Sequence, residues 1–292
     1  MEFLLSAILG IIQGILEFLP VSSSGHLAAI EQLIHLPYNM SFFNVCIHMG
    51  TLLAILIALQ KDIARLLAES LLMIQDAFHN LFTFLRAARK HEEPKLRKIL
   101  TSNYRRLSML IAVGAVPTAV IGILLRDVAA ISSNSLLYPG IGMLMNGIVL
   151  IVVGQLTPGN KIPKDISSLK GFLAGIAQGF TVISGISHSA VMLSAGILLG
   201  FNKRLSIRYA YLMSIPCIIG ALIIETASLD KSLITPDYLG MCAIGTLCSL
   251  LIGVLFIQRL LRYIRTRSLN QFAFYNFLIG VVIIILYFTF TI

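Results

Sequence analysis

Long apolar runs recur along the whole chain, separated by shorter polar segments. A helix needs about 20 apolar residues to cross the hydrocarbon core of a bilayer, and six segments of this sequence meet that requirement. They are Phe42 to Gln60, Leu107 to Leu125, Leu136 to Leu156, Ile207 to Ile224, Tyr238 to Ile257 and Phe272 to Ile292. The pattern predicts an all-α polytopic membrane protein with six transmembrane helices.

Two further apolar stretches, Met1 to Leu36 and Gly171 to Phe201, are interrupted near the middle by serine, glycine and other polar residues. Neither can form one continuous lipid-facing helix. Broken backbone at membrane depth is tolerated where it is buried in protein or lines a wet cavity. We therefore expect both stretches to form re-entrant helical hairpins.

Composition agrees with a membrane protein. Of 292 residues, 57% are hydrophobic and 12% are charged, about half the charged fraction of an ordinary soluble domain. A chain with so few charges cannot cover itself with polar surface, which excludes a soluble protein.

The basic residues are distributed asymmetrically. All of the 22 lysine and arginine residues except Arg126 and Lys231 lie in segments that the six spans place on one side. By the positive-inside rule this side is cytoplasmic. Basic residues next to a membrane usually face anionic lipid headgroups, so the net charge of +9 predicts contact with membrane lipids and no nucleic-acid partner.

This topology makes the two hairpins inverted, because the first must enter from outside and the second from inside. Their sequences also match at an offset of 165: Gln13-Gly14 corresponds to Gln178-Gly179, and Ser22-x-Ser24 to Ser187-x-Ser189. Inverted repeats whose broken helices meet near the midplane place a ligand site at the repeat interface. We predict a single membrane domain built from two inverted repeats, about residues 1–156 and 157–292.

Ionisable residues inside a membrane are costly to bury and generally mark function. Glu17 and His26 flank the Ser22-Ser23-Ser24-Gly25 break, and His188 lies between two serines of the second break. If the breaks meet, they share one polar pocket. A carboxylate, imidazoles, hydroxyls and exposed backbone amides suit a phosphate ester, because helix N-termini and free N–H groups neutralise anionic oxygens.

Structural alternatives stay open for these residues. Glu17 could pair with Gln13 one helical turn away for packing alone, and His26 could be a hydrogen-bonded core histidine. Asn44 and His48 share one face of the first span, where they could support the pocket or simply form hydrogen bonds between helices.

The segment from Gln13 to His26 resembles the signature of the undecaprenyl-diphosphate phosphatase (bacitracin-resistance) family, and the similarity extends over nearly the whole chain. The resemblance implies a bacterial inner-membrane enzyme with an outward-facing active site. Such an enzyme removes the terminal phosphate of undecaprenyl diphosphate, recycles the lipid carrier of cell-wall synthesis and confers bacitracin resistance. It also implies a divalent cation, Mg²⁺ or Ca²⁺, and a polyprenyl diphosphate lipid as the substrate.

Carried over by position, the resemblance implies that Gln13 and Glu17 bind the metal and that Glu17, Ser23 and His26 are catalytic. Either Ser23 or His26 could be the nucleophile. Nucleophile and base need hydrogen-bond proximity, so we expect Ser23 to attack with His26 as its base. The residues expected to bind substrate are Gln13, Ser22, Ser24, Gly25, Ser187 and Ser189.

The second break departs from the family, which usually reads Pro-Gly-x-Ser-Arg-Ser where this chain has Ser184-Gly185-Ile186-Ser187-His188-Ser189. Arginine offers phosphate a permanent charge and two donors, whereas histidine carries at most one charge. We take His188 as the catalytic counterpart of that arginine. Its presence keeps two alternatives open: a polyprenyl-phosphate transporter, or a protein that binds the lipid diphosphate without cleaving it. A homo-oligomer is also compatible with the sequence.

Overall fold

The computed structural model describes residues 2–34, 40–229 and 234–291. Met1, Leu36, Lys231 and Ile292, which entered the predictions above, lie outside these ranges. The described chain is helical, and its bounds are α1 Glu2–Leu16, α2 Ser23–Ile34, α3 Met40–Ala58, α4 Gln60–Lys90, α5 Asn103–Leu124, α6 Arg126–Ser133, α7 Leu137–Gly154, α8 Ser168–Gly179, α9 His188–Leu198, α10 Lys203–Ser228, α11 Pro236–Thr266 and α12 Leu269–Thr291. Two short 3₁₀ turns, Pro163–Asp165 and Phe180–Val182, flank α8.

Six of these helices, α3, α5, α7, α10, α11 and α12, are long and apolar enough to cross a membrane. They confirm the six predicted spans and the all-α polytopic class. Helices α10 and α11 extend furthest beyond the predicted spans, because polar residues lengthen them. Asn202 caps α10 by accepting a hydrogen bond from the Leu205 amide, and α11 runs from a Thr235 cap through an arginine-rich end to Thr266.

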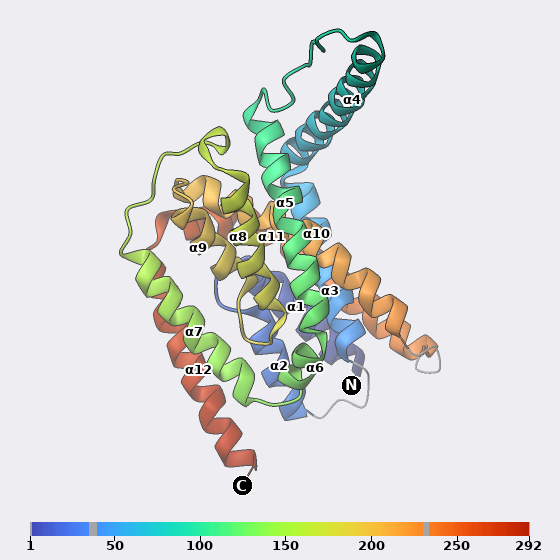
Figure 1. Cartoon of the computed structure of the whole chain (residues 1–292). Coiled ribbons are helices and arrows are strands. Elements are labelled where there is room, and N and C mark those ends of the chain that lie inside the picture. Colours follow the sequence, from blue (N-terminus) through green and yellow to red (C-terminus); the bar gives the residue numbers. More distant parts are fainter. Residues whose placement is uncertain (1, 35–39, 230–233, 292) are drawn as a thin grey trace.

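Both interrupted stretches form helical hairpins. In Figure 1, α1 and α2 meet at a turn inside the bundle, and α8 and α9 meet at a second turn after entering from the opposite end. Each break ends with a serine that caps the returning helix: the Gly25 amide donates to Ser22 Oγ (3.1 Å), and the Ala190 amide donates to Ser187 Oγ (3.2 Å). The predicted inverted re-entrant hairpins are therefore present.

Small residues let the hairpins pack closely on the spans, as is common between membrane helices. A Cβ added to Gly10 of α1 would lie 2.2 Å from the Gly245 carbonyl oxygen of α11, and one added to Gly175 of α8 would lie 2.0 Å from the Gly114 carbonyl oxygen of α5. Gly10 and Gly175 are themselves 165 residues apart. The division into repeats at residues 156 and 157 stays a prediction.

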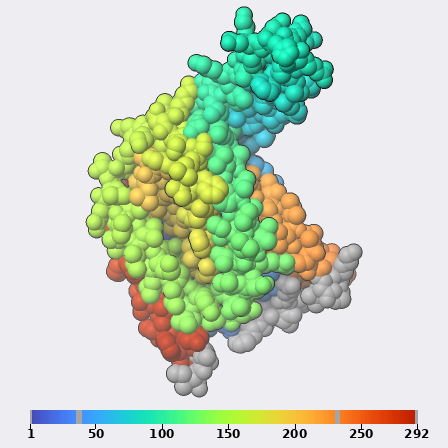
Figure 2. Space-filling view, viewed as in Figure 1, coloured from blue at the N-terminus to red at the C-terminus, as the bar shows by residue number. Residues whose placement is uncertain are grey.

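Helix α4 extends beyond the bundle, as Figures 1 and 2 show. It carries acidic partners for the basic residues around it: Arg105 at the start of α5 contacts Glu69 (2.9 Å) and Asp76 (2.7 Å). Arg208 of α10 pairs with Asp62. These ion pairs hold the base of α4 to two spans at one end of the molecule, away from the site described next.

Candidate active site

The two breaks meet, and between them lies a cavity of about 540 Å³. Contact between the breaks is direct, because Ser189 Oγ donates a hydrogen bond to the Leu19 carbonyl oxygen (2.7 Å) and a Cβ on Gly25 would lie 3.1 Å from Gly185 Cα. The structure thus brings most of the predicted residues to one place. Those that line the cavity are Glu17, Ser22, Ser23, Ser24, Ser187, His188 and Ser189.

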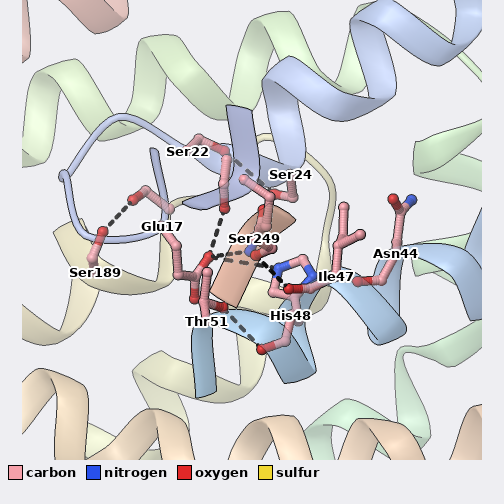
Figure 3. A network of polar contacts seen from close by, with 12 residues as sticks. Glu17, Ser22, Ser24, Asn44, Ile47, His48, Thr51, Ser189 and Ser249 are labelled. Atoms are coloured by element: carbon pink, nitrogen blue, oxygen red, sulfur yellow. Dashed lines mark hydrogen bonds and ion pairs between the residues drawn. The ribbon is translucent and has the colours of Figure 1, made fainter. Parts of the chain in front are cut away.

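Glu17 is the centre of the polar network in the cavity wall (Figure 3). Its side chain is 8% exposed, and its Oε2 atom accepts hydrogen bonds from Gln13 Nε2 (3.0 Å) and Ser23 Oγ (2.8 Å). The carboxylate projects from the break just after α1, where Pro20 prevents the helix from continuing. A buried carboxylate is costly unless donors or a cation compensate it.

His26 lies differently from our expectation. Its Nδ1 atom is 2.8 Å from the Ser22 carbonyl oxygen, its Nε2 atom is 2.9 Å from the Tyr275 hydroxyl of α12, and the two rings stack. Both ring nitrogens are therefore occupied, and His26 is not among the residues that line the cavity. The expected hydrogen bond between Ser23 and His26 is absent from the described residues, because Ser23 donates to Glu17 instead.

His188 begins α9 and faces the cavity with both ring nitrogens buried and without a hydrogen-bond partner among the described residues. The break that carries it is held from behind by Asn146 of α7. The Asn146 amide donates to the Gly185 carbonyl oxygen (2.7 Å) and accepts from the Ser187 amide (3.0 Å). Asn276 of α12 plays the matching part for the first break, donating to the Pro20 carbonyl oxygen (2.9 Å).

Sequence reasoning missed two features of this cavity. Asn146 was not expected to hold a break, since an asparagine within a span shows nothing of its partners. Arg126, at the start of α6, provides the one lysine or arginine side chain among the described lining residues. The sequence offered one hint of this role: Arg126 is one of the few charged residues on the side of the membrane opposite the basic segments.

The cavity lining extends from the buried breaks to Arg126, Ser133, Glu225 and Ser228. Arg126 and Ser133 bound α6, and Glu225 and Ser228 lie in the last turn of α10. In Figure 1, α6 and the end of α10 lie far from α4. The cavity therefore reaches the end of the bundle opposite α4.

The donor set fits a divalent cation that is shared with a phosphate. No group of three or more His, Cys, Asp and Glu side chains able to hold a metal occurs among the described residues. However, Mg²⁺ is usually bound by one or two carboxylates together with substrate phosphates and water. Glu17 supplies the carboxylate, and the buried Gln13 Oε1 atom has no partner among the described residues, so an acceptor is available beside it.

Fold and site together define a class: a polytopic membrane protein in which two inverted broken hairpins enclose a buried carboxylate, serine hydroxyls and two helix N-termini. Helix N-termini favour anions, so the class is one that handles an anionic group within the membrane. The chain belongs to the bacitracin resistance protein BacA family, whose sequence profile matches residues 6–282.

Full-length relatives support this membership. The chain is 35% identical over 289 residues to an undecaprenyl-diphosphatase of Methanosphaera stadtmanae, covering 98% of both chains. It is 32% identical over 280 residues to the protein of that name from Alkaliphilus metalliredigens, covering 95% of this chain and 96% of the relative. A Nocardioides protein with the same name is 35% identical over 288 residues, covering 98% and 96%.

Proposed function

We propose that this protein is a membrane phosphatase that hydrolyses undecaprenyl diphosphate to undecaprenyl phosphate and inorganic phosphate. The observation that carries the proposal is the hydrogen bond from Ser23 to the buried Glu17 in a cavity shared by both breaks. Membership of the family and the hydrolase name of the relatives favour hydrolysis over the transporter and the non-catalytic binder. Recycling of the lipid carrier for cell-wall synthesis and bacitracin resistance follow from this activity.

The chemistry assigned to the protein's own residues begins at Ser23. Its hydroxyl proton points at Glu17 Oε2, so attack of Ser23 Oγ on the terminal phosphorus passes that proton to the carboxylate. The anhydride P–O bond breaks, undecaprenyl phosphate leaves, and water then releases phosphate from the serine. We therefore propose Glu17 as the base in place of His26, because Ser23 donates to Glu17 and both ring nitrogens of His26 have other partners.

The remaining residues orient the diphosphate. Ser22, Ser24, Ser187 and Ser189 line the cavity at the N-termini of α2 and α9, where their hydroxyl groups would face the anionic oxygens. The Gly25 amide donates to Ser22 Oγ, so Gly25 would shape the break without contacting the substrate. His188 offers an unpartnered ring nitrogen to the diphosphate. His26 holds the Ser22 carbonyl oxygen and so positions the break rather than contacting the substrate.

A divalent cation, Mg²⁺ or Ca²⁺, would be held by Glu17 and Gln13. When bound, it would supply charge neutralisation at the phosphate oxygens. The side-chain oxygen Oε1 of Gln13 has no hydrogen-bond partner among the described residues and is available to the ion.

For location, we propose the bacterial inner membrane with the cavity open to the outer face. The support is the charge asymmetry: the basic loops lie at the α4 end, which the positive-inside rule places in the cytoplasm. The lipid tail of the substrate would then remain in the bilayer while its diphosphate enters between the hairpins.

The test is phosphate release from undecaprenyl diphosphate by purified protein with Mg²⁺ or Ca²⁺. We expect Glu17→Ala and Ser23→Ala to lower the rate about 10²–10⁴-fold, the usual size of acid–base and nucleophile contributions, while the exposed Glu93→Gln serves as the control. We expect His188→Arg to raise the rate. The phosphatase would be refuted if the wild type and His188→Arg both bind the lipid diphosphate but neither releases phosphate.

A further inference from the structure

Helix α4 leaves a regular line of large apolar side chains uncovered. They recur at alternating steps of four and three residues, and each is between 48% and 61% exposed: Leu67, Leu71, Ile74, Phe78, Leu81 and Leu85. Because an α-helix has 3.6 residues per turn, this spacing places all six on one side of α4. We call this line the α4 stripe. It is about 27 Å long at 1.5 Å per residue.

The protein's own chain covers the opposite side of α4. Glu69 and Asp76 pair with Arg105 at the start of α5. The Asn80 side chain donates to the Arg97 carbonyl oxygen and accepts from the Arg97 amide, both at 2.8 Å. Helical geometry places Glu69, Asp76 and Asn80 on the side opposite the stripe. The stripe therefore faces away from the segment that ties α4 to the bundle.

A contiguous exposed apolar surface of this kind marks an interaction site. Helices that bind an anionic lipid surface carry lysine and arginine beside their apolar face. From Leu66 to Leu85, α4 contains no lysine or arginine, and Figures 1 and 2 show the helix extending away from the bundle. This part of α4 has no electrostatic attraction to such a surface, which favours a protein surface as the partner.

The stripe is suited to pair with an identical stripe. Its alternating steps average about 3.5 residues, the repeat of two helices that coil around each other. The positions that border it carry no charge, so two stripes can meet without burying a charge or opposing like charges; these positions are Ala68, Ser70, Gln75, Ala77, Phe82 and Phe84. A surface that is complementary to itself is what a two-fold dimer requires.

We propose that the α4 stripe is a dimerisation surface, which packs against the α4 stripe of a second copy of this chain. Two copies in one membrane have the same orientation, so their two-fold axis runs along the membrane normal and the two α4 helices run in the same direction. The cavity opens at the other end of the bundle. The dimer is therefore independent of the proposed phosphatase activity.

The test is the mass of the full-length protein in detergent micelles, measured by light scattering over a range of protein concentrations. We expect a dimer in the wild type. Leu71→Gln combined with Phe78→Gln changes two stripe positions in each copy, so the dissociation constant of the dimer should rise at least about 100-fold.

The matched control is Leu72→Gln combined with His79→Gln, which makes the same replacements one position further along. Leu72 is 45% exposed but lies off the stripe, so the dissociation constant should not change. Thermal melts and phosphate release should be the same in both double variants as in the wild type, because α4 lies outside the bundle and away from the cavity.

Cross-linking checks the contact in membranes. Ile74→Cys should link to its counterpart through a short bis-maleimide, whereas Leu72→Cys should not exceed the background from the four native cysteines. The inference is overturned by a wild type with the mass of one chain at every concentration, by a dimer that persists in Leu71→Gln with Phe78→Gln, or by equal cross-linking of the two cysteine variants.

The membrane surface is the other possible cover of the stripe. A monomeric protein in which a nitroxide on Leu71→Cys reports burial among lipids would assign the stripe to that surface and overturn the dimer. A wild-type dimer that releases no phosphate refutes the phosphatase and leaves the dimer standing, whereas a monomer that releases phosphate refutes the dimer alone.

Discussion

Replacing Asn146 by alanine tests how the wall of the cavity that carries His188 is held in place. The asparagine amide pairs with two buried backbone groups of the second break, the Gly185 carbonyl oxygen and the Ser187 amide. Asn146 is 2% exposed, so water cannot take over these contacts easily. Each buried backbone group left without a partner costs about 1–3 kcal/mol.

The free energy of unfolding of Asn146→Ala should therefore fall by about 2–6 kcal/mol. Asn276→Ala is the matched control, because Asn276 holds the first break through one backbone group only, the Pro20 carbonyl oxygen. Its expected loss is about half as large. Both values can be measured by denaturant titration in detergent micelles, followed by circular dichroism.

Activity measurements should separate the contribution of Asn146 to stability from its contribution to substrate binding. Because the Ser187 amide and His188 belong to the same turn, loosening it should raise KM for undecaprenyl diphosphate by more than Asn276→Ala does. The reasoning would be refuted by a loss in Asn146→Ala below about 1 kcal/mol, or by a loss no larger than that of Asn276→Ala.

Three further predictions follow from single contacts. Gly185→Ala should destabilise the protein by about 1–2 kcal/mol or more, because Gly185 has φ of 90° and an added Cβ would lie 2.4 Å from a backbone oxygen; Gly122→Ala, where nothing lies within 4 Å, should be neutral in the same thermal melt. A hydrogen bond from Arg105, together with a weaker one from Arg97, lowers the pKa of the Asp76 carboxyl below its ordinary value of 3.8. The stability it contributes is therefore present above pH 3.8 and lost as pH falls through the lowered pKa; Asp76→Asn should be less stable than wild type at neutral pH, with the difference disappearing in acid. Tyr275→Phe frees His26 Nε2 and should lower kcat severalfold with unchanged thermal stability, and an unchanged kcat would show that this hydrogen bond does not position the break.

The position of His26 shows where local reasoning reaches its limit. His26 lies three positions after Ser23, and on a helix this spacing makes the two side chains neighbours. The imidazole nevertheless turns to Tyr275, which lies 249 residues further along the chain. Which of several nearby groups a polar side chain contacts depends on what the rest of the fold places around it.

The sequence by itself determined the six spans, the two broken hairpins and the serine-rich breaks. The physical reason is the bilayer, which demands long apolar segments and tolerates broken backbone only inside the protein. Tertiary structure alone decided the chemistry of the contacts: Ser23 bonded to Glu17, Asn146 behind the second break, and the Nε2 atom of His48 facing the carboxylate. The hydropathy of a segment depends only on its own residues, so it can be assessed from the sequence. Contacts within about 4 Å depend on how helices far apart in the sequence pack together.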